Sequence, residues 1–99
     1  MTDEMPQKPR IEIHFCPGCR WWLRAGWMAQ ELFSTYGEAI AEVALVTAES
    51  GAFFIRVGDA VVWERKADGG FPDPKTLKQR LLPYIDPEKD LGHASAEAP

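Results

Sequence analysis

The fold is decided by the stretch Ile11-Glu12-Ile13-His14-Phe15-Cys16-Pro17-Gly18-Cys19. Its first five residues alternate between apolar and polar side chains, which is the two-residue period of a strand with one buried face. Pro17 and Gly18 then favour a turn, and the only two cysteines of the chain stand on either side of them. The stretch therefore predicts a strand that ends in a Cys-Pro-Gly-Cys turn.

From Cys19 onward the apolar residues recur at intervals of three or four, which is typical of one face of a helix. Gly37 supplies a stop for this helix. The predicted apolar face consists of Trp21, Ala25, Met28, Leu32 and Tyr36, widened by Trp22, Ala29 and Phe33.

The next segments predict three more strands. Residues 39–46 are apolar except for Glu42, which predicts a strand in a buried, central position of a sheet. Because a helix-length crossover separates it from the first strand, the two are expected to be parallel. Residues 53–57 and 60–64 flank Gly58-Asp59, a two-residue turn that indicates a β-hairpin.

The rest of the chain predicts a loop over residues 66–71 and a second helix. Asp73 can cap this helix, with Pro74 in its first turn, where the missing N–H of proline costs nothing. Pro83 is expected to end or kink it, and its apolar face consists of Leu77, Leu81, Leu82 and Tyr84.

The predicted order is β-α-β-β-β-α, which indicates an α/β protein of thioredoxin-like fold, with a four-stranded mixed sheet and two helices. The domain is expected to span residues 10–86. The polar segment 1–9 predicts a flexible arm, and the Ala-, Glu- and Pro-rich segment 87–99 predicts a disordered tail.

Length and composition restrict the function. A chain of 99 residues, 45% of them apolar, supports one core. The net charge of −4 offers no basic surface to nucleic acid, no apolar run approaches the roughly 20 residues that span a bilayer, and residues 1–6 do not resemble a secretion signal. We therefore expect a cytoplasmic protein, where a CxxC pair is more often catalytic or metal-binding than structural.

The predicted catalytic residues are Cys16 and Cys19. The start of a helix carries unpaired N–H groups and a partial positive charge, which stabilise a thiolate and lower its pKa. Arg20 and Arg24 would add to this effect if they point toward the turn. On this argument Cys16 would attack a substrate disulfide and Cys19 would resolve the mixed disulfide.

Three other interpretations stay open. The two thiols would be merely structural if the turn were buried. A zinc site would need about four ligands, which this chain reaches only as a dimer sharing both cysteines, with His14 and His93 as further candidates. Alternatively, exposed aromatic residues after the turn would make the protein a non-enzymatic interaction module that oxidation of the CxxC motif switches; Trp22, Trp27 and Phe71 are the candidates.

The sequence also resembles a known family. The stretch from Ile11 to Cys19 is similar to the strand and redox turn of the selenoprotein W-like (Rdx) family, in a cysteine-containing form. The similarity continues through Gly51-Ala52-Phe53-Phe54-Ile55-Arg56-Val57, Gly58, Trp63 and Gly69-Gly70-Phe71-Pro72-Asp73, and covers roughly residues 10–86. The resemblance implies a thioredoxin-like fold, a redox function in cell redox homeostasis, protein thiols, glutathione or thioredoxin as partners, and no bound metal or other cofactor.

The resemblance also bears on the site. It brings the loop of Phe71 near the redox turn, and we assign substrate or partner binding to Pro17, Gly18, Trp22 and Phe71. In selenium-containing relatives the selenocysteine stands at the position of Cys19, which implies that Cys19 attacks, so the roles of the two cysteines stay open. Thioredoxins have a cis-proline where this chain has Gly51-Ala52-Phe53, so substrate docking is expected to differ.

Overall fold

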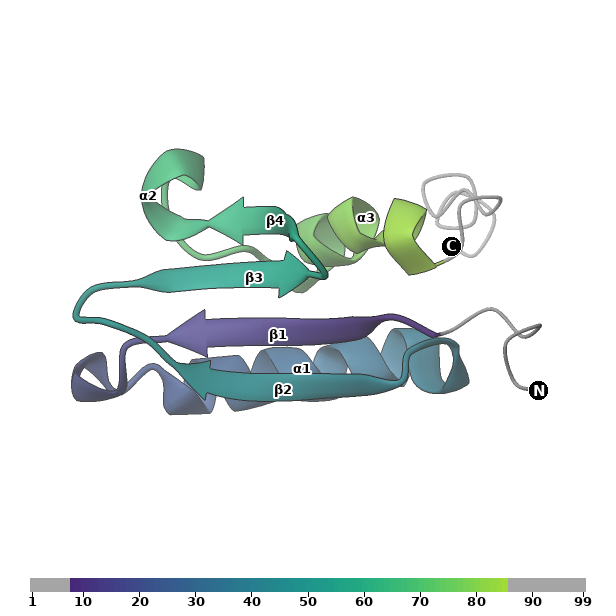
Figure 1. Ribbon diagram of the computed structural model, residues 1–99, viewed down its shortest axis with the longest axis horizontal. Coiled ribbons are helices and arrows are strands. Elements are labelled where there is room, and N and C mark those ends of the chain that lie inside the picture. Colours follow the sequence, from purple (N-terminus) through teal and green to yellow (C-terminus); the bar gives the residue numbers. More distant parts are fainter. Residues whose placement is uncertain (1–7, 86–99) are drawn as a thin grey trace.

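A computed structural model describes residues 8–85 of the chain. Its core is a four-stranded sheet in the order β2-β1-β3-β4 (Figure 1). The elements in chain order are β1 (Arg10–Phe15), η2 (Pro17–Cys19), α1 (Trp22–Tyr36), η3 (Gly37–Ala39), β2 (Glu42–Thr47), β3 (Phe53–Val57), β4 (Ala60–Glu64), α2 (Arg65–Asp68) and α3 (Pro74–Ile85).

Strand β1 lies inside the sheet and pairs on both sides. It runs parallel to β2, with Ile13 opposite Leu45, and antiparallel to β3, with Ile13 opposite Ile55. The predicted alternation is confirmed, since Ile11, Ile13 and Phe15 are buried while the intervening side chains face the other side. The predicted β-α-β unit and mixed sheet are therefore confirmed.

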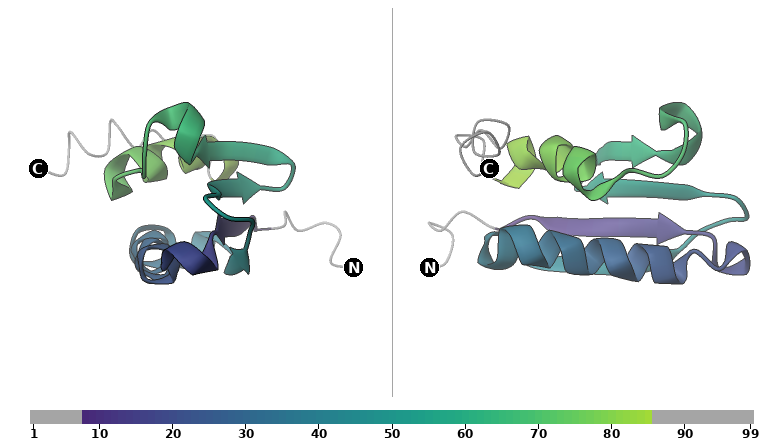
Figure 2. Two further views of the ribbon diagram at one scale, coloured as in Figure 1. Left: turned by 90° about the vertical axis from the view of Figure 1, so that its left-hand side faces the viewer. Right: turned by 180° about the vertical axis from the view of Figure 1, so that it is seen from behind.

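Helices α1 and α3 both cover the same face of the sheet (Figure 2). Buried Ala25, Met28 and Leu32 of α1 meet the apolar side chains of β1 and β3 in one core. Leu77 and Leu81 add the inner face of α3. Burial of each large apolar side chain contributes roughly 1.5–3 kcal/mol, and this one-sided core holds the layers together.

The hairpin of β3 and β4 contains a β-bulge. The pairing shifts between Ile55 and Arg56, because Ile55 faces Trp63 whereas Arg56 faces Val61. The extra residue is Val62, and both it and Trp63 are buried. A bulge of this kind bends the strand and re-aims its side chains, so β4 presents two consecutive residues to the core.

Several predictions about individual elements were wrong. Strand β2 is an edge strand, not a central one, and its Leu45 is 45% exposed. Helix α2 replaces the first part of the predicted loop, and α3 continues through Pro83 to Ile85. In both helices the predicted apolar face was too wide, because the exposed large side chains include Trp22, Phe33 and Tyr84.

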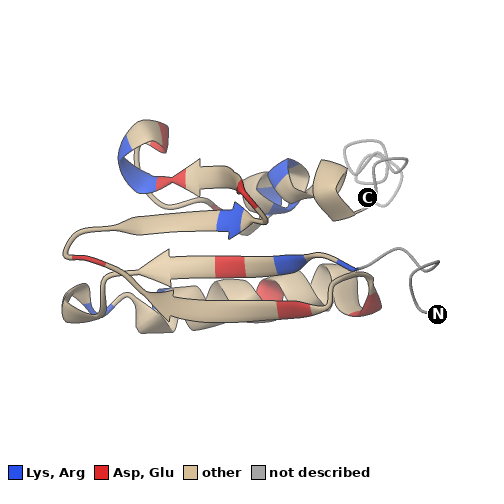
Figure 3. Cartoon of the chain, in the orientation of Figure 1, with Lys and Arg blue, Asp and Glu red and all other residues tan. Residues whose placement is uncertain are grey.

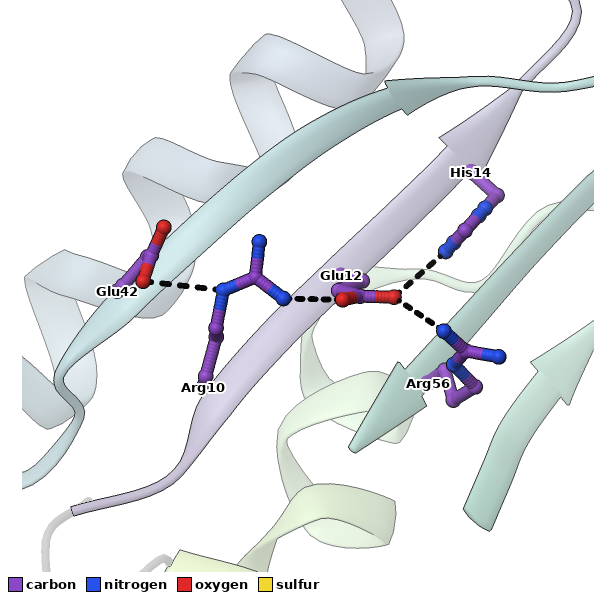
Figure 4. Close-up of polar contacts among 5 residues, drawn as sticks. All are labelled: Arg10, Glu12, His14, Glu42 and Arg56. Carbon is purple, nitrogen blue, oxygen red and sulfur yellow. Dashed lines mark hydrogen bonds and ion pairs between the residues drawn. The ribbon is translucent and has the colours of Figure 1, made fainter. Parts of the chain in front are cut away.

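The uncovered face of the sheet carries a network of charges centred on Glu12 (Figure 4). Oε1 of Glu12 accepts hydrogen bonds from Nε2 of His14 at 2.8 Å and from Nη2 of Arg56 at 2.7 Å. Arg10 binds the other carboxylate oxygen and also pairs with Glu42 at 3.0 Å. These partners lower the pKa of Glu12 to about 2, chiefly through the bonds from His14 and Arg56.

The helices and strands run from Arg10 to Ile85, and the domain bounds of residues 10–86 stay a prediction. Most of the predicted arm, residues 1–9, and all of the predicted tail, residues 87–99, lie outside the described residues. Within residues 8–85, no helix combines the length and the apolar character that crossing a membrane requires.

Candidate redox site

The two cysteines lie where three segments meet at one end of the sheet. The turn η2 follows β1, the segment 48–52 leads into β3, and α2 follows β4 (left side of Figure 1). The amide of Ala48 donates to the carbonyl of Phe15 at 2.7 Å, which fastens the second segment to the end of β1. Strand pairing thus brings together residues that are far apart in the sequence.

The turn itself is tight and holds both sulfur atoms on one side. The amide of Cys19 donates to the carbonyl of Cys16 at 3.3 Å, and that of Arg20 donates to Pro17 at 3.1 Å. Arg20 has a positive φ of 63°, a left-handed conformation that is uncommon outside glycine and ends the turn. The Sγ atoms of Cys16 and Cys19 are 2.6 Å apart, so a disulfide requires only a small displacement.

The two thiols occupy different environments. Cys16 is 3% exposed, whereas Cys19 is more accessible. The pKa of Cys16 is lowered, first by the hydrogen bond that Cys19 donates to it and then by the backbone amide of Gly51. The pKa of Cys19 is raised, because its proton is held in the bond to Cys16 and because it is partly buried. The first negative charge on the pair therefore rests on Cys16.

Gly51 is the backbone contact that the two thiols share. Its amide lowers the pKa of both Cys16 and Cys19. Gly51 has a φ of 78°, which other residues adopt only at a cost, and it lies in a turn closed by the bond from Ala52 N to Glu49 O at 3.0 Å. The glycine thus allows the turn in which this amide stabilises the charged form of both thiols.

Two predicted sources of positive potential lie elsewhere. Helix α1 begins at Trp22 and not at the redox turn, so Arg20 and Trp21 separate Cys19 from the first turn of the helix. The guanidinium of Arg24 stacks over the ring of Phe71 at 4.2 Å. The cation that does lower the pKa of Cys19 is Arg65, which the sequence analysis did not single out.

An aromatic cluster lies next to the redox turn and consists of Trp21, Phe53 and Phe71. The ring of Phe71 meets those of Trp21 and Phe53 edge-on, with centroids 4.9 Å apart in both pairs. Arg24 covers one side of the cluster, and Arg65 lies over Trp21 at 5.1 Å. Phe71 therefore joins the site through Trp21, as part of a packed group.

The other predicted site residues divide into two sets. Pro17 and Gly18 are exposed on the turn, and Trp22 is 51% exposed on the outer side of α1. His14 lies on the opposite face of the sheet from the core, stacked on Phe54 at 4.4 Å and bonded to Glu12, so it does not join the thiols.

Among the described residues, no three His, Cys, Asp or Glu side chains gather as a metal site would require; His93 lies outside them.

A small cavity of about 240 Å³ opens next to Gly51. It shares Gly51 with the pair and is bordered by polar groups from β4 and α2. Its lining residues are Glu49, Ser50, Gly51, Ala52, Glu64 and Lys66. Gly51 thus borders a cavity that is lined mainly by polar residues.

Comparison with known proteins identifies the family of the chain. The model of the Rdx family matches residues 10–82, which include β1, both cysteines, Gly51 and Arg65. The chain belongs to the Rdx family. No curated protein matches it.

Two crystal structures resemble this Rdx protein over most of its length. A protein from Bordetella parapertussis is 51% identical, with a TM-score of 0.77, and the match covers 80% of this chain and all of that one. A selenoprotein W-related protein from Vibrio cholerae is 46% identical, with a TM-score of 0.77, and the match covers 81% of this chain and all of that one. The predicted family and the thioredoxin-like α/β fold are therefore confirmed.

Proposed function

We propose that this Rdx protein is a thiol–disulfide redox protein that uses Cys16 and Cys19 to reduce disulfides, sulfenic acids or glutathione adducts. The observation that carries the proposal is the pair itself: two sulfur atoms 2.6 Å apart, one buried with a lowered pKa and one accessible. A thiolate is the nucleophile in thiol–disulfide exchange. A nearby accessible sulfur allows the second step to stay within the molecule.

The unequal environments suggest how the chemistry proceeds. The first proton leaves Cys16, whose pKa is lowered, and the remaining proton stays on Cys19, whose pKa is raised. Transfer of this proton across the contact moves the charge to the accessible Cys19, which attacks one sulfur of a substrate disulfide and releases the other as a thiolate. The released thiolate takes the proton of Cys16, which then attacks Sγ of Cys19 and releases the second substrate sulfur as a thiolate. Two electrons pass to the substrate, and a Cys16–Cys19 disulfide remains.

The partners we propose are protein thiols and disulfides, with glutathione or thioredoxin as the reductant that reopens the disulfide. We assign contact with such a partner to Pro17 and Gly18, which are exposed on the turn, and to Phe71, which packs on Trp21 next to it. The dithiol supplies the electrons, so this mechanism uses no bound cofactor. We place the protein in the cytoplasm, where thiols are kept reduced.

A redox titration tests the proposal. The purified protein is equilibrated in glutathione buffers at several pH values, its thiols are alkylated, and the products are identified by mass spectrometry. We expect a reversible Cys16–Cys19 disulfide within the cytosolic range of about −220 to −320 mV, and fast alkylation of one cysteine at pH 6. Two sluggish thiols that form no reversible disulfide would refute the proposal.

One observation favours a second function, an interaction module switched by oxidation. Helix α1 carries only Arg24 and Glu31 as charged residues (Figure 3), and four of its large apolar side chains are 42–77% exposed: Trp22, Leu23, Trp27 and Phe33. This face begins just after the redox turn. If it is the functional surface, the affinity for an apolar peptide should differ several-fold between the dithiol and disulfide forms, with negligible turnover.

A further inference from the structure

The segment that contacts the thiols is itself held in place by a side chain from α2. Nη2 of Arg65 donates to the carbonyl of Gly51 at 3.1 Å. The same guanidinium lies over the ring of Trp21 at 5.1 Å. Arg65 therefore bridges Gly51, whose amide lowers the pKa of both thiols, and the ring of Trp21, which follows the redox turn.

We propose that Arg65 is a positioning residue for the redox pair: it holds Gly51 by its carbonyl so that the Gly51 amide stays directed at Cys16 and Cys19. The inference rests on the proposed function of the pair. Arg65 directly follows β4. It comes near the thiols because the end of β4 and the redox turn lie at the same end of the sheet (Figure 1).

The surroundings of Arg65 leave its charge available to the thiols. The neighbouring carboxylates have other partners, since Glu64 caps α2 by accepting from the amide of Ala67 at 2.7 Å and Asp68 pairs with Arg80 at 2.9 Å. Within residues 8–85 Arg65 makes no ion pair, and its buried Nε has no hydrogen-bond partner. The positive charge therefore acts on Cys19, whose pKa it lowers.

The shape of the side chain matters as well as its charge. A guanidinium is planar, so it can stack on Trp21 while one of its N–H groups donates to Gly51. An ammonium at the same position would keep the charge but not this combination of contacts. Substitution of Arg65 by lysine or by glutamine therefore separates the contribution of its charge from that of its planar shape.

The test compares Arg65→Gln with Arg24→Gln, a matched control. Arg24 also stacks on the aromatic cluster, over Phe71, but it is not among the groups that shift either thiol. Thiol pKa values are read from thiolate absorbance and from the pH dependence of alkylation. We expect Arg65→Gln to raise the pKa values of the pair and to slow alkylation at pH 7 by about three- to tenfold, since one pKa unit changes the thiolate fraction up to tenfold. Arg24→Gln should match the wild type.

A second variant keeps the test decisive if Arg65→Gln is poorly folded. In Arg65→Lys the charge remains, so alkylation should stay within about twofold of the wild type. The amide signal of Gly51, followed by NMR, should shift with thiol ionisation in the wild type and shift less in Arg65→Lys. Equal thiol pKa values and equal Gly51 shifts in all variants would overturn the inference.

The outcome is independent of whether the proposed function holds. Thiol pKa values and the Gly51 signal are measured on the dithiol protein without any substrate. If the wild type forms no reversible disulfide, the proposed function fails, although Arg65 can still be shown to act on the thiols. If the wild type is redox-active and the Arg65 variants are unchanged, the positioning role fails alone.

Discussion

Two cysteines of identical chemistry ionise differently because their surroundings differ. Cys16 receives a hydrogen bond from its partner and is buried under the segment of Gly51, so the charged form is stabilised there despite the burial. Cys19 provides that bond and therefore keeps its proton longer. In a coupled pair such as this, each cysteine sets the acidity of the other.

Alanine substitution of either cysteine should shift the pKa of the remaining thiol, and the two shifts should have opposite signs. Cys19→Ala removes the bond that most lowers the pKa of Cys16, so that pKa should rise. Cys16→Ala removes the main cause of the raised pKa of Cys19, so that pKa should fall. The pH dependence of iodoacetamide alkylation measures both values. A pKa of Cys16 that stays low in Cys19→Ala, or a pKa of Cys19 that stays high in Cys16→Ala, would show that the thiols are not coupled as described.

Among the elements, α1 and α3 are joined by two partly buried polar contacts, one of which is the ion pair of Lys78 with Glu31 at 3.1 Å. The hydroxyl of Tyr36 donates to the carbonyl of Lys78 at 2.6 Å. Burial raises the pKa of Tyr36 to about 12. Because the folded-state pKa exceeds the ordinary value of 10, this tyrosine supports the fold fully below pH 10 and loses that contribution as the pH rises toward 12.

Removing this hydroxyl should destabilise the packing of the two helices. Tyr36→Phe is expected to lower the free energy of unfolding by about 1 kcal/mol, the usual net worth of one hydrogen bond. Tyr84→Phe is the matched control, because Tyr84 is 45% exposed and surface changes of this kind stay within about 0.5 kcal/mol. Urea unfolding measures both. A loss for Tyr84→Phe as large as for Tyr36→Phe would contradict the assignment.

The sequence predicted those elements whose pattern is periodic. Alternation located β1, helical spacing located α1 and α3, and Gly58-Asp59 located the hairpin. The sequence of helix α2, Arg-Lys-Ala-Asp, has no apolar periodicity. The helix is stabilised at its start by the side chain of Glu64, which accepts a hydrogen bond from the amide of Ala67. The edge position of β2 was missed because apolar composition also suits a strand covered by a helix on one face.

The candidate site was predictable only in part, for a similar reason. The spacing of Cys16 and Cys19 identified the sulfur atoms directly. Gly51 and Arg65 act on them through strand pairing and a side chain that reaches from another element. Nothing local in residues 48–52 or 65–68 indicates that they meet the redox turn, so their roles required the tertiary structure.

At the scale of the whole molecule, helices cover one face of the sheet, and the other face carries a network of ion pairs and hydrogen bonds. On the uncovered face Glu12 is bonded by His14 and Arg56 and remains ionised far below its usual range (Figure 4). Glu12 belongs to β1 and Arg56 to β3, so the carboxylate crosslinks the two inner strands. The network therefore stabilises the sheet from the side that the core does not reach.

This network should make stability depend on acid. The folded-state pKa of Glu12, about 2, lies below its ordinary value of 4.5, so its contribution is present above pH 4.5 and is lost as the pH falls toward 2. Glu12→Gln should be less stable at neutral pH and should lose less stability over that range. Glu42→Gln, which removes a half-exposed partner of Arg10, is the control and should retain the acid dependence of the wild type in urea unfolding.

The placement of the redox turn on β1 also determines how the site responds to local opening of the fold. Folded proteins open in parts, and edges and short terminal elements open at a lower free-energy cost than inner strands. Strand β1 is bonded on both sides, whereas β4 and α2 lie at an edge. Opening of that edge would withdraw Arg65 while leaving Cys16 and Cys19 adjacent. Under the proposed function, such opening would slow the reduction of substrate before it prevents formation of the Cys16–Cys19 disulfide, so partial unfolding would lower the rate before it abolishes the reaction.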